Sequence, residues 1–209
     1  MIPVKVLAVR YLANASPALC RALGAPRGYP SLAMLTTDCD DATYIALDAA
    51  TKAAEVEVAY GRSFYAGAAN ASTPNAGEVI GILAARTPGA ARSGMEAALA
   101  ALERLGFEET AGVPYLAHTV SSVGSFLARE AGVPQGSALA YLIGPPLEGM
   151  YALDAALKAA DVELKKLYVP PSETNFGGGL LSGTQSACEA ACGAFAEAVQ
   201  EVAARPVEM

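Results

Sequence analysis

Three carboxylates fall within four residues, at Asp38, Asp40 and Asp41, in the stretch TTDCDDAT between an apolar run and a helix-like pattern. Asp favours the N-cap and the positive end of a helix, but one Asp suffices for that role. Carboxylates this close repel one another unless a cation lies near them. The cluster therefore favours a functional role over simple capping. Cys39 lies within it, and its acidic neighbours should raise its pKa and keep it unreactive.

The same stretch has a second interpretation as the start of a phosphatase. An apolar strand followed by D-x-D resembles the beginning of Mg²⁺-dependent phosphatases with an aspartate nucleophile, in which Asp38 would attack and Asp40 would act as general acid. That motif usually has Thr or Val two residues after the second Asp, where this chain has Ala42. The downstream Lys and Asp of such enzymes are not evident either, so this alternative is weak.

Cysteine and histidine do not form a recognisable metal site. Cys188 and Cys192 are four residues apart, and so lie on one face of a helix. A zinc site needs further ligands, and the only histidine is His118. We expect both cysteines to be small buried residues. The chain also lacks a P-loop, a Rossmann fingerprint and a nucleophile elbow, so it predicts no cofactor, no metal and no enzyme activity.

The elements that must position these residues occur twice. Ten of thirteen positions are identical between ALDAATKAAEVEV (46–58) and ALDAALKAADVEL (152–164), at an offset of 106. Residues 16–26 match 124–134 at an offset of 108, and residues 87–98 match 184–195 at an offset of 97. Self-similarity in a constant order indicates an internal duplication. It predicts two domains, residues 1–106 and 107–209, with nine extra residues in the first copy.

Comparison of the two repeats tests whether the acidic cluster serves only to cap a helix. At the offset of 106, Asp40 and Asp41 correspond to Pro146 and Leu147. The fold therefore does not require carboxylates at this point.

Each repeat is expected to be a mixed α/β unit, of an α+β sandwich-like type, with helices packed on one sheet. Strands are expected in the first repeat at 4–12, 31–37, 56–65 and 77–84, and in the second at 114–123, 138–144, 162–169 and 178–183.

Helix signals fall between these strands. A short helix is predicted by Ser16 as N-cap, Pro17 at the first helical position and Gly24 just after the end. In the second repeat, Gly132 is expected to end the corresponding helix in the same way. The duplicated segment predicts a helix with i,i+4 pairs at Asp48–Lys52 and Asp154–Lys158. Closing helices are expected to begin at Thr87 and Thr184.

Composition narrows the class of protein. The net charge of −7 argues against nucleic acid and anionic lipid as partners. Hydrophobic residues make up 53% and the mean hydropathy is +0.32, which predicts surface buried between domains and subunits. The longest uncharged run, 131–147, is broken by Pro and Gly and cannot span a membrane. No secretory signal is evident, and four cysteines without framework spacing fit a reducing, cytoplasmic location.

At this level of detail the chain resembles the bacterial microcompartment shell proteins. The stretches that carry the resemblance are DCDDATY (38–44), EVEVAYGRSFYAGAANAS (55–72), AGEVIGILA (76–84), PPLEGMYALDAALKAADVEL (145–164), PPSETNF (170–176) and GTQSACEAAC (183–192). Tandem, circularly permuted copies of the shell domain are similar to the trimeric type found in ethanolamine-utilisation compartments. The resemblance implies a non-enzymatic tile in a cytoplasmic compartment shell, in which three chains form a pseudo-hexagonal plate that meets other shell proteins edge to edge.

The resemblance also implies roles for particular residues. A small pore within each subunit would bind ethanolamine through Asp40, Asp41 and Glu78, and carboxylates suit an ammonium with three donors. Tile edges would contain Lys52 and Lys158, whose simpler interpretation is a solvated i,i+4 pair. A gated central pore would be lined by Tyr65, Ala66, Gly67, Asn70, Asn175, Phe176 and Gly177. A tile of another compartment, handling propanediol or ethanol, is the main alternative.

Overall fold

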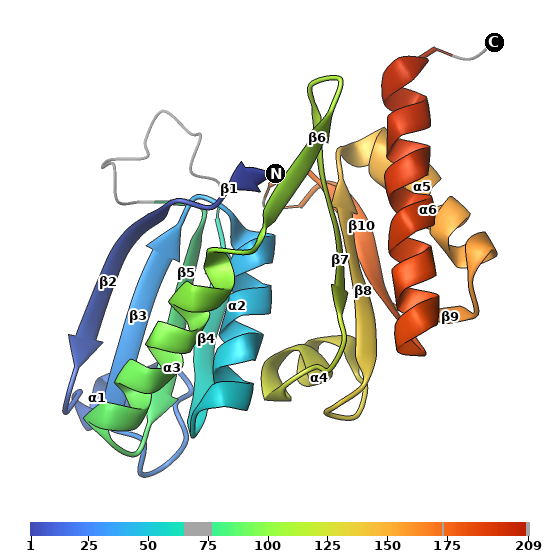
Figure 1. Cartoon of the computed structure of the whole chain (residues 1–209). Coiled ribbons are helices and arrows are strands. Elements are labelled where there is room, and N and C mark those ends of the chain that lie inside the picture. The colour runs from blue at the N-terminus through green and yellow to red at the C-terminus, as the bar shows by residue number, and fades with distance from the viewer. Residues whose placement is uncertain (65–76, 173, 208–209) are drawn as a thin grey trace. The chain divides into compact units, whose positions relative to one another are not determined.

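The computed structural model describes residues 1–64, 77–172 and 174–207. The chain divides into two compact units. The N-terminal unit comprises residues 3–106 and 124–127, and the C-terminal unit comprises residues 1–2, 107–123 and 128–209. Each unit has its own sheet and helices (Figure 1), so the fold is α+β with two sheets.

The N-terminal unit follows the expected order of elements. It contains β2 (Val6–Leu12), α1 (Pro17–Ala22), β3 (Ser31–Thr37), α2 (Asp40–Ala53), β4 (Val56–Ser63), β5 (Val79–Ala85) and α3 (Pro88–Leu102). The strands form an antiparallel sheet in the order β2-β3-β5-β4. Helices α2 and α3 pack side by side on one face of this sheet (Figure 1).

The C-terminal unit repeats this plan and extends it. Its elements are β1 (Ile2–Pro3), β6 (Gly106–Thr110), β7 (Val113–Val120), α4 (Ser125–Ala131), β8 (Ala138–Gly144), α5 (Pro146–Ala159), β9 (Val162–Tyr168), β10 (Gly177–Gly183) and α6 (Gln185–Ala204). The order β7-β8-β10-β9 matches the N-terminal sheet, and β1 and β6 are added at one edge. The β6–β7 hairpin was not predicted, although Ala111 and Gly112 both have positive φ, as a two-residue hairpin turn requires.

The two sheets share an irregularity as well as an order of strands. The ladder between β4 and β5 skips Ala59, and the ladder between β9 and β10 skips Lys165. These residues correspond at the offset of 106. A bulge that is kept in both copies supports a common origin of the repeats. The offset then falls to 98 at β5 and β10, so most of the extra length of the first copy lies between β4 and β5.

The predicted helix starts are confirmed. Ser16 accepts a hydrogen bond from the N–H of Ala18, and Pro17 begins α1. The hydroxyls of Thr87 and Thr184 accept from the N–H groups three residues on, at Ala90 and Ala187. Each side chain satisfies a donor that the first turn of a helix leaves unpaired.

The longest helix, α6, is 20 residues long and has one buried face. Phe195 and Val199 are fully buried against the sheet, while Glu189 and Glu201 face outward. This is the pattern of a surface helix. Within the described ranges no helix combines the length and apolar character needed to cross a bilayer.

A buried carboxylate fixes the start of α4. The side chain of Asp48, on α2, is fully buried. Its Oδ2 accepts the N–H of Gly124 (2.7 Å) and its Oδ1 accepts the N–H of Leu127 (2.9 Å). Lys52 Nζ lies 3.3 Å from Oδ2. Asp48 therefore caps a helix 76 residues further along the chain, and the predicted pair with Lys52 is not a solvated surface pair.

We expect Asp48→Ala to lower the free energy of unfolding by about 2–4 kcal/mol, because two buried N–H groups and Lys52 would lose their acceptor. Urea unfolding followed by circular dichroism measures this change. Asp161→Ala is the matched control: Asp161 is exposed, and its loss should change stability by no more than about 0.5 kcal/mol. Equal stability of the two variants would contradict the structural role of Asp48.

Candidate functional site

The acidic cluster lies where β3 passes into α2. Strand β3 ends at Thr37 and α2 begins at Asp40, with Cys39 as its N-cap. The Thr37 hydroxyl accepts the N–H of Cys39 (3.2 Å), and Thr43 Oγ1 donates to the Cys39 carbonyl (2.7 Å). The two hydroxyls are 2.7 Å apart and both threonines are fully buried. The sequence prediction missed Thr37 and Thr43, although a Thr beside a helix start is a recognisable turn signal.

Asp40 and Asp41 are both buried, with exposed fractions of 8% and 7%. They occupy the first turn of α2, where the helix dipole favours negative charge. Neither is the N-cap, because Cys39 holds that position without a side-chain hydrogen bond. Asp40 Oδ1 accepts the N–H of Asp41 at 2.9 Å. Two carboxylates in one turn exceed what capping requires, as the sequence suggested.

Glu78 directly precedes β5, which pairs with β3, and it therefore lies near the end of β3 where the acidic cluster begins. Its N–H donates to the carbonyl of Thr37 at 2.8 Å. Burial raises the pKa of the Glu78 carboxyl, and the charges of Asp40 and Asp38 raise it further. The structure therefore brings Glu78 together with the cluster on α2, across 38 positions of sequence. A group that displaces water here and carries positive charge would relieve the repulsion.

Cys39 has the electrostatic environment that the sequence predicted. Burial is the largest factor that raises the pKa of its thiol, and the charges of Asp41, Asp40 and Glu78 raise it further. A backbone hydrogen bond from Ala42 acts in the opposite direction. The thiol form is favoured, so Cys39 is a poor nucleophile and a poor metal ligand.

Asp38 is exposed and differs from its two neighbours. Its Oδ1 accepts the N–H of Lys5 on the chain segment before β2, at 2.7 Å, and its own N–H donates to the Lys5 carbonyl. These two hydrogen bonds join the segment before β2 to the segment after β3 at the end of the sheet. Among the described residues, no three His, Cys, Asp or Glu side chains are grouped so that they could hold a metal ion.

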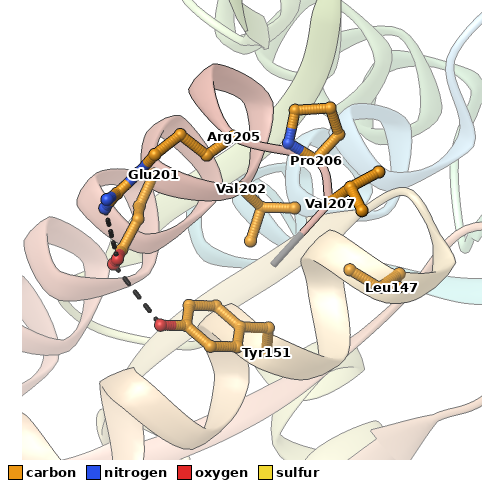
Figure 2. A pocket seen from close by; sticks show the side chains of 7 residues that line it. All are labelled: Leu147, Tyr151, Glu201, Val202, Arg205, Pro206 and Val207. Atoms are coloured by element: carbon orange, nitrogen blue, oxygen red, sulfur yellow. Dashed lines mark hydrogen bonds and ion pairs between the residues drawn. The ribbon is translucent and has the colours of Figure 1, made fainter. Parts of the chain in front are cut away.

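The corresponding place in the C-terminal unit has a different chemical character. Pro146 and Leu147 stand where the first repeat has Asp40 and Asp41, and they begin α5. Leu147 lines a hollow of about 380 Å³ (Figure 2). The other lining residues are Tyr151, Glu201, Val202, Arg205, Pro206 and Val207.

Among the described residues that line this hollow, the one carboxylate already has partners. Glu201 accepts from the Tyr151 hydroxyl (3.4 Å) and pairs with Arg205 (3.1 Å). The acidic site is therefore a property of the first repeat alone.

The proposed pore residues are described only in part. Tyr65, Ala66, Gly67 and Asn70 lie outside the described residues. In the second loop, Asn175 is exposed and has a φ of 61°, and Gly177 opens β10. Phe176 is half-buried, with its ring 5.7 Å from that of Phe107 and its carbonyl held by the Ser172 hydroxyl.

The two candidate edge lysines are not equivalent. Lys158 is 74% exposed and pairs with Asp154, which is also exposed. Lys52 is only 38% exposed and pairs with the buried Asp48. The expectation of a solvated pair holds for Lys158 alone.

Cys188 and Cys192 are buried in the core of the C-terminal unit, as predicted. Burial raises the pKa of the Cys192 thiol to about 11 and also raises the pKa of Cys188. Thr119 donates a hydrogen bond to the Cys192 sulfur at 3.3 Å. Both residues pack as small apolar side chains beside Phe195.

Comparison with known proteins gives a consistent result over the whole chain. The model of the BMC domain matches residues 31–114. The bacterial microcompartment shell protein EutL of Clostridium perfringens is 56% identical over 99% of this chain and 97% of its own length. The crystal structure of the ethanolamine utilization protein EutL from Leptotrichia buccalis superimposes with a TM-score of 0.96, at 55% identity, over 100% of this chain and 98% of that one.

A more distant structure shares the fold alone. The trimeric bacterial microcompartment shell protein PduB is 21% identical and superimposes with a TM-score of 0.81, over 96% of this chain and 89% of that one.

We predict that Glu78→Gln raises the melting temperature at pH 7.5 by roughly 1–3 °C, because Gln removes one of several crowded negative charges. A raised pKa in the folded state means that the wild type loses stability as the pH rises from the ordinary value of Glu through the raised one. The difference between variant and wild type should therefore vanish near pH 4. Differential scanning calorimetry across this range measures it.

Glu57→Gln, on β4, is the matched control and should show no such pH-dependent gain. If the melting temperature of Glu78→Gln, measured against that of the wild type, were lower at pH 7.5 than at pH 4, the proposed charge repulsion would be contradicted.

Proposed function

The chain belongs to the EutL family of bacterial microcompartment shell proteins, and we propose that it forms a trimeric tile of an ethanolamine-utilisation shell that binds ethanolamine at its acidic site. Membership in this family makes it a structural shell protein and not an enzyme. The phosphatase interpretation of Asp38 and Asp40 is therefore wrong. The observation that carries the ligand proposal is the acidic cluster of the first repeat, in which the buried Asp40 and Asp41 lie near the half-buried Glu78.

The alternative of a tile for another compartment is disfavoured. Identity to EutL is 56% over the full length, whereas identity to PduB is 21%. The acidic site favours the same conclusion, since propanediol and ethanol carry no positive charge, whereas the ammonium of ethanolamine is attracted to carboxylates.

The trimer follows from the duplication. Homo-oligomers close with cyclic symmetry, and three copies of a duplicated chain give six similar domains around one axis. The high apolar content of the chain supplies surface for such contacts. Edge-to-edge contacts with other shell proteins would then build the layer.

Ethanolamine would bind weakly, as a molecule in transit should. The ammonium would donate charge-assisted hydrogen bonds to the carboxylates of Asp40, Asp41 and Glu78, each bond contributing roughly 1.5–3 kcal/mol in a shielded site. A ligand of four heavy atoms has a ceiling of about −1.5 kcal/mol per atom, or roughly −6 kcal/mol. That limits the dissociation constant to tens of micromolar at best, and about millimolar is more realistic. Weak binding lets a pore release what it admits.

Gating of the central pore is part of the proposal. Residues 65–76, which include Tyr65, Ala66, Gly67 and Asn70, lie outside the described residues, and their proposed part in a gate rests on the resemblance to the family. In the second loop, Phe176 packs on Phe107 in the described conformation and would have to leave it to obstruct a pore. Ethanolamine would bias such a gate only by its differential affinity for the two states.

We expect calorimetric titration of ethanolamine into the wild type to show binding that Asp41→Asn or Glu78→Gln weakens at least tenfold. Removing one carboxylate should cost over about 1.4 kcal/mol, which is a factor of ten. Glu57→Gln is the matched control and should bind as the wild type does. Equal affinity in all four proteins, or ethanolamine density away from these carboxylates in a soaked crystal, would contradict the proposed site.

Lys158→Ala should abolish sheets or tubes of the overexpressed protein while the trimer remains intact, as electron microscopy and sedimentation can show. Lys158 is exposed and would lie at the tile edge, where the loss of its cation removes a contact repeated around every tile. Alanine is preferable to Asp here, because Asp would place a second carboxylate beside Asp154. Lys158→Arg keeps the cation and should assemble normally. Normal sheets from Lys158→Ala would refute the edge role of this residue.

A further inference from the structure

A hollow of about 300 Å³ lies beside α1 in the N-terminal unit. It is lined by residues of the segment 14–30, which connects β2 to β3. Ala15, Cys20 and Tyr29 form much of its apolar part. The hollow adjoins the start of β3, whereas the acidic cluster follows the end of that strand (Figure 1). A strand of seven residues spans roughly 20 Å, so the hollow is separate from the proposed ethanolamine site.

Three arginines lie at this hollow. Arg21 and Arg27 line it. Arg86 adjoins it, because its guanidinium lies 4.8 Å from the centre of the Tyr29 ring and an added Cβ on Gly28 would lie 3.5 Å from its Nη1. None of the described lining residues is acidic, and within the described ranges no carboxylate forms an ion pair with these arginines. In a chain with a net charge of −7, such a group of cations attracts anions locally.

The second repeat forms the same turn as the one that borders the hollow. Gly28 and Gly136, which correspond at the offset of 108, have φ values of 81° and 87°. The next residue, Tyr29 or Ser137, donates its N–H to a proline carbonyl three residues earlier, at 3.2 Å in both repeats. Glycine and the backbone therefore set this turn.

The residues that differ between the repeats are the ones that could hold an anion. At the offsets of 108 and 97, the counterparts of Arg27, Tyr29 and Arg86 are Gln135, Ser137 and Gly183. The second repeat thus lacks two of the guanidinium groups and the ring on which one of them stacks. Because its turn forms without them, the fold does not require these side chains.

We propose that this hollow binds a small organic anion, with its phosphate or carboxylate group at the arginines and its apolar body against Ala15, Cys20 and Tyr29. A guanidinium donates two parallel N–H groups to either oxyanion. Stacking on Tyr29 restricts the plane of Arg86 and leaves the N–H groups at its edge able to donate. The volume is at the lower end for small-molecule sites, which suits a body of about one ring.

Calorimetric titration of phenyl phosphate into the full-length protein, in a buffer without phosphate, tests this site. Arg27→Gln, which copies Gln135, and Arg86→Gln should each weaken binding roughly tenfold, because a hydrogen bond between charged groups is lost. Arg86→Lys keeps the charge without the planar fork, and should weaken binding less than Arg86→Gln does. Arg104→Gln changes an exposed arginine after α3 and should bind as the wild type does.

Three further ligands separate the two parts of the interaction. Phenol has the ring without the anion, and inorganic phosphate has the anion without the ring. Each should bind more weakly than phenyl phosphate, because each lacks one set of contacts. Benzoate carries a carboxylate in place of the phosphate. Binding of benzoate or of phenyl phosphate supports the site, and the tighter of the two identifies the anionic group.

The contradicting outcomes are distinct from those of the proposed function. The proposal is overturned if neither phenyl phosphate nor benzoate binds the wild type, or if Arg27→Gln and Arg86→Gln bind them unchanged. It is also overturned if phenol or inorganic phosphate alone binds as tightly as phenyl phosphate. Titration of ethanolamine into Arg27→Gln should match the wild type, so the two sites can fail separately. Circular dichroism of each variant confirms that it remains folded.

Discussion

A buried carboxylate with converging donors is the interaction on which the rest of this structure depends. Asp48 can lose its water only because two backbone N–H groups and Lys52 replace it. The same interaction fixes the start of α4 against α2. A similar helix sequence in the second repeat leaves Asp154 exposed, so the two repeats share a fold but not an environment.

The acidic site follows from a second difference between the repeats. Helix α5 begins with Pro146 and Leu147, so the fold does not require carboxylates at the positions that Asp40 and Asp41 occupy on α2. Burial raises the pKa of Glu78, and the charges of Asp40 and Asp38 raise it further. The proposed ligand would profit from this arrangement, because a positively charged group is attracted to neighbouring carboxylates. Both repeats thus have the same fold, but only the first has carboxylates at the positions of Asp40 and Asp41.

The sequence predicted most of the fold, because its signals are local. The strands, the helices and the caps at Ser16, Thr87 and Thr184 depend on residues close together in the chain, and the duplication shows that these local signals recur in the same order. It could not predict the burial of Asp48, since Asp48–Lys52 and Asp154–Lys158 look alike and differ only in contacts made across more than 70 residues. The proximity of Glu78 to Asp40 was inferred by resemblance alone, and it depends on the pairing of β3 with β5. The β6–β7 hairpin was missed because a non-Gly residue, Ala111, holds a positive φ in its turn.

We propose that this chain is one third of a closed ring of three identical chains. Sedimentation equilibrium of the wild-type protein at micromolar concentration tests it most directly. The account predicts a single species with three times the chain mass of 21.2 kDa, and no change of mass on moderate dilution. A stable species of 21.2 kDa at that concentration would contradict it, because a single chain supplies only two of the six domains that the proposed tile requires.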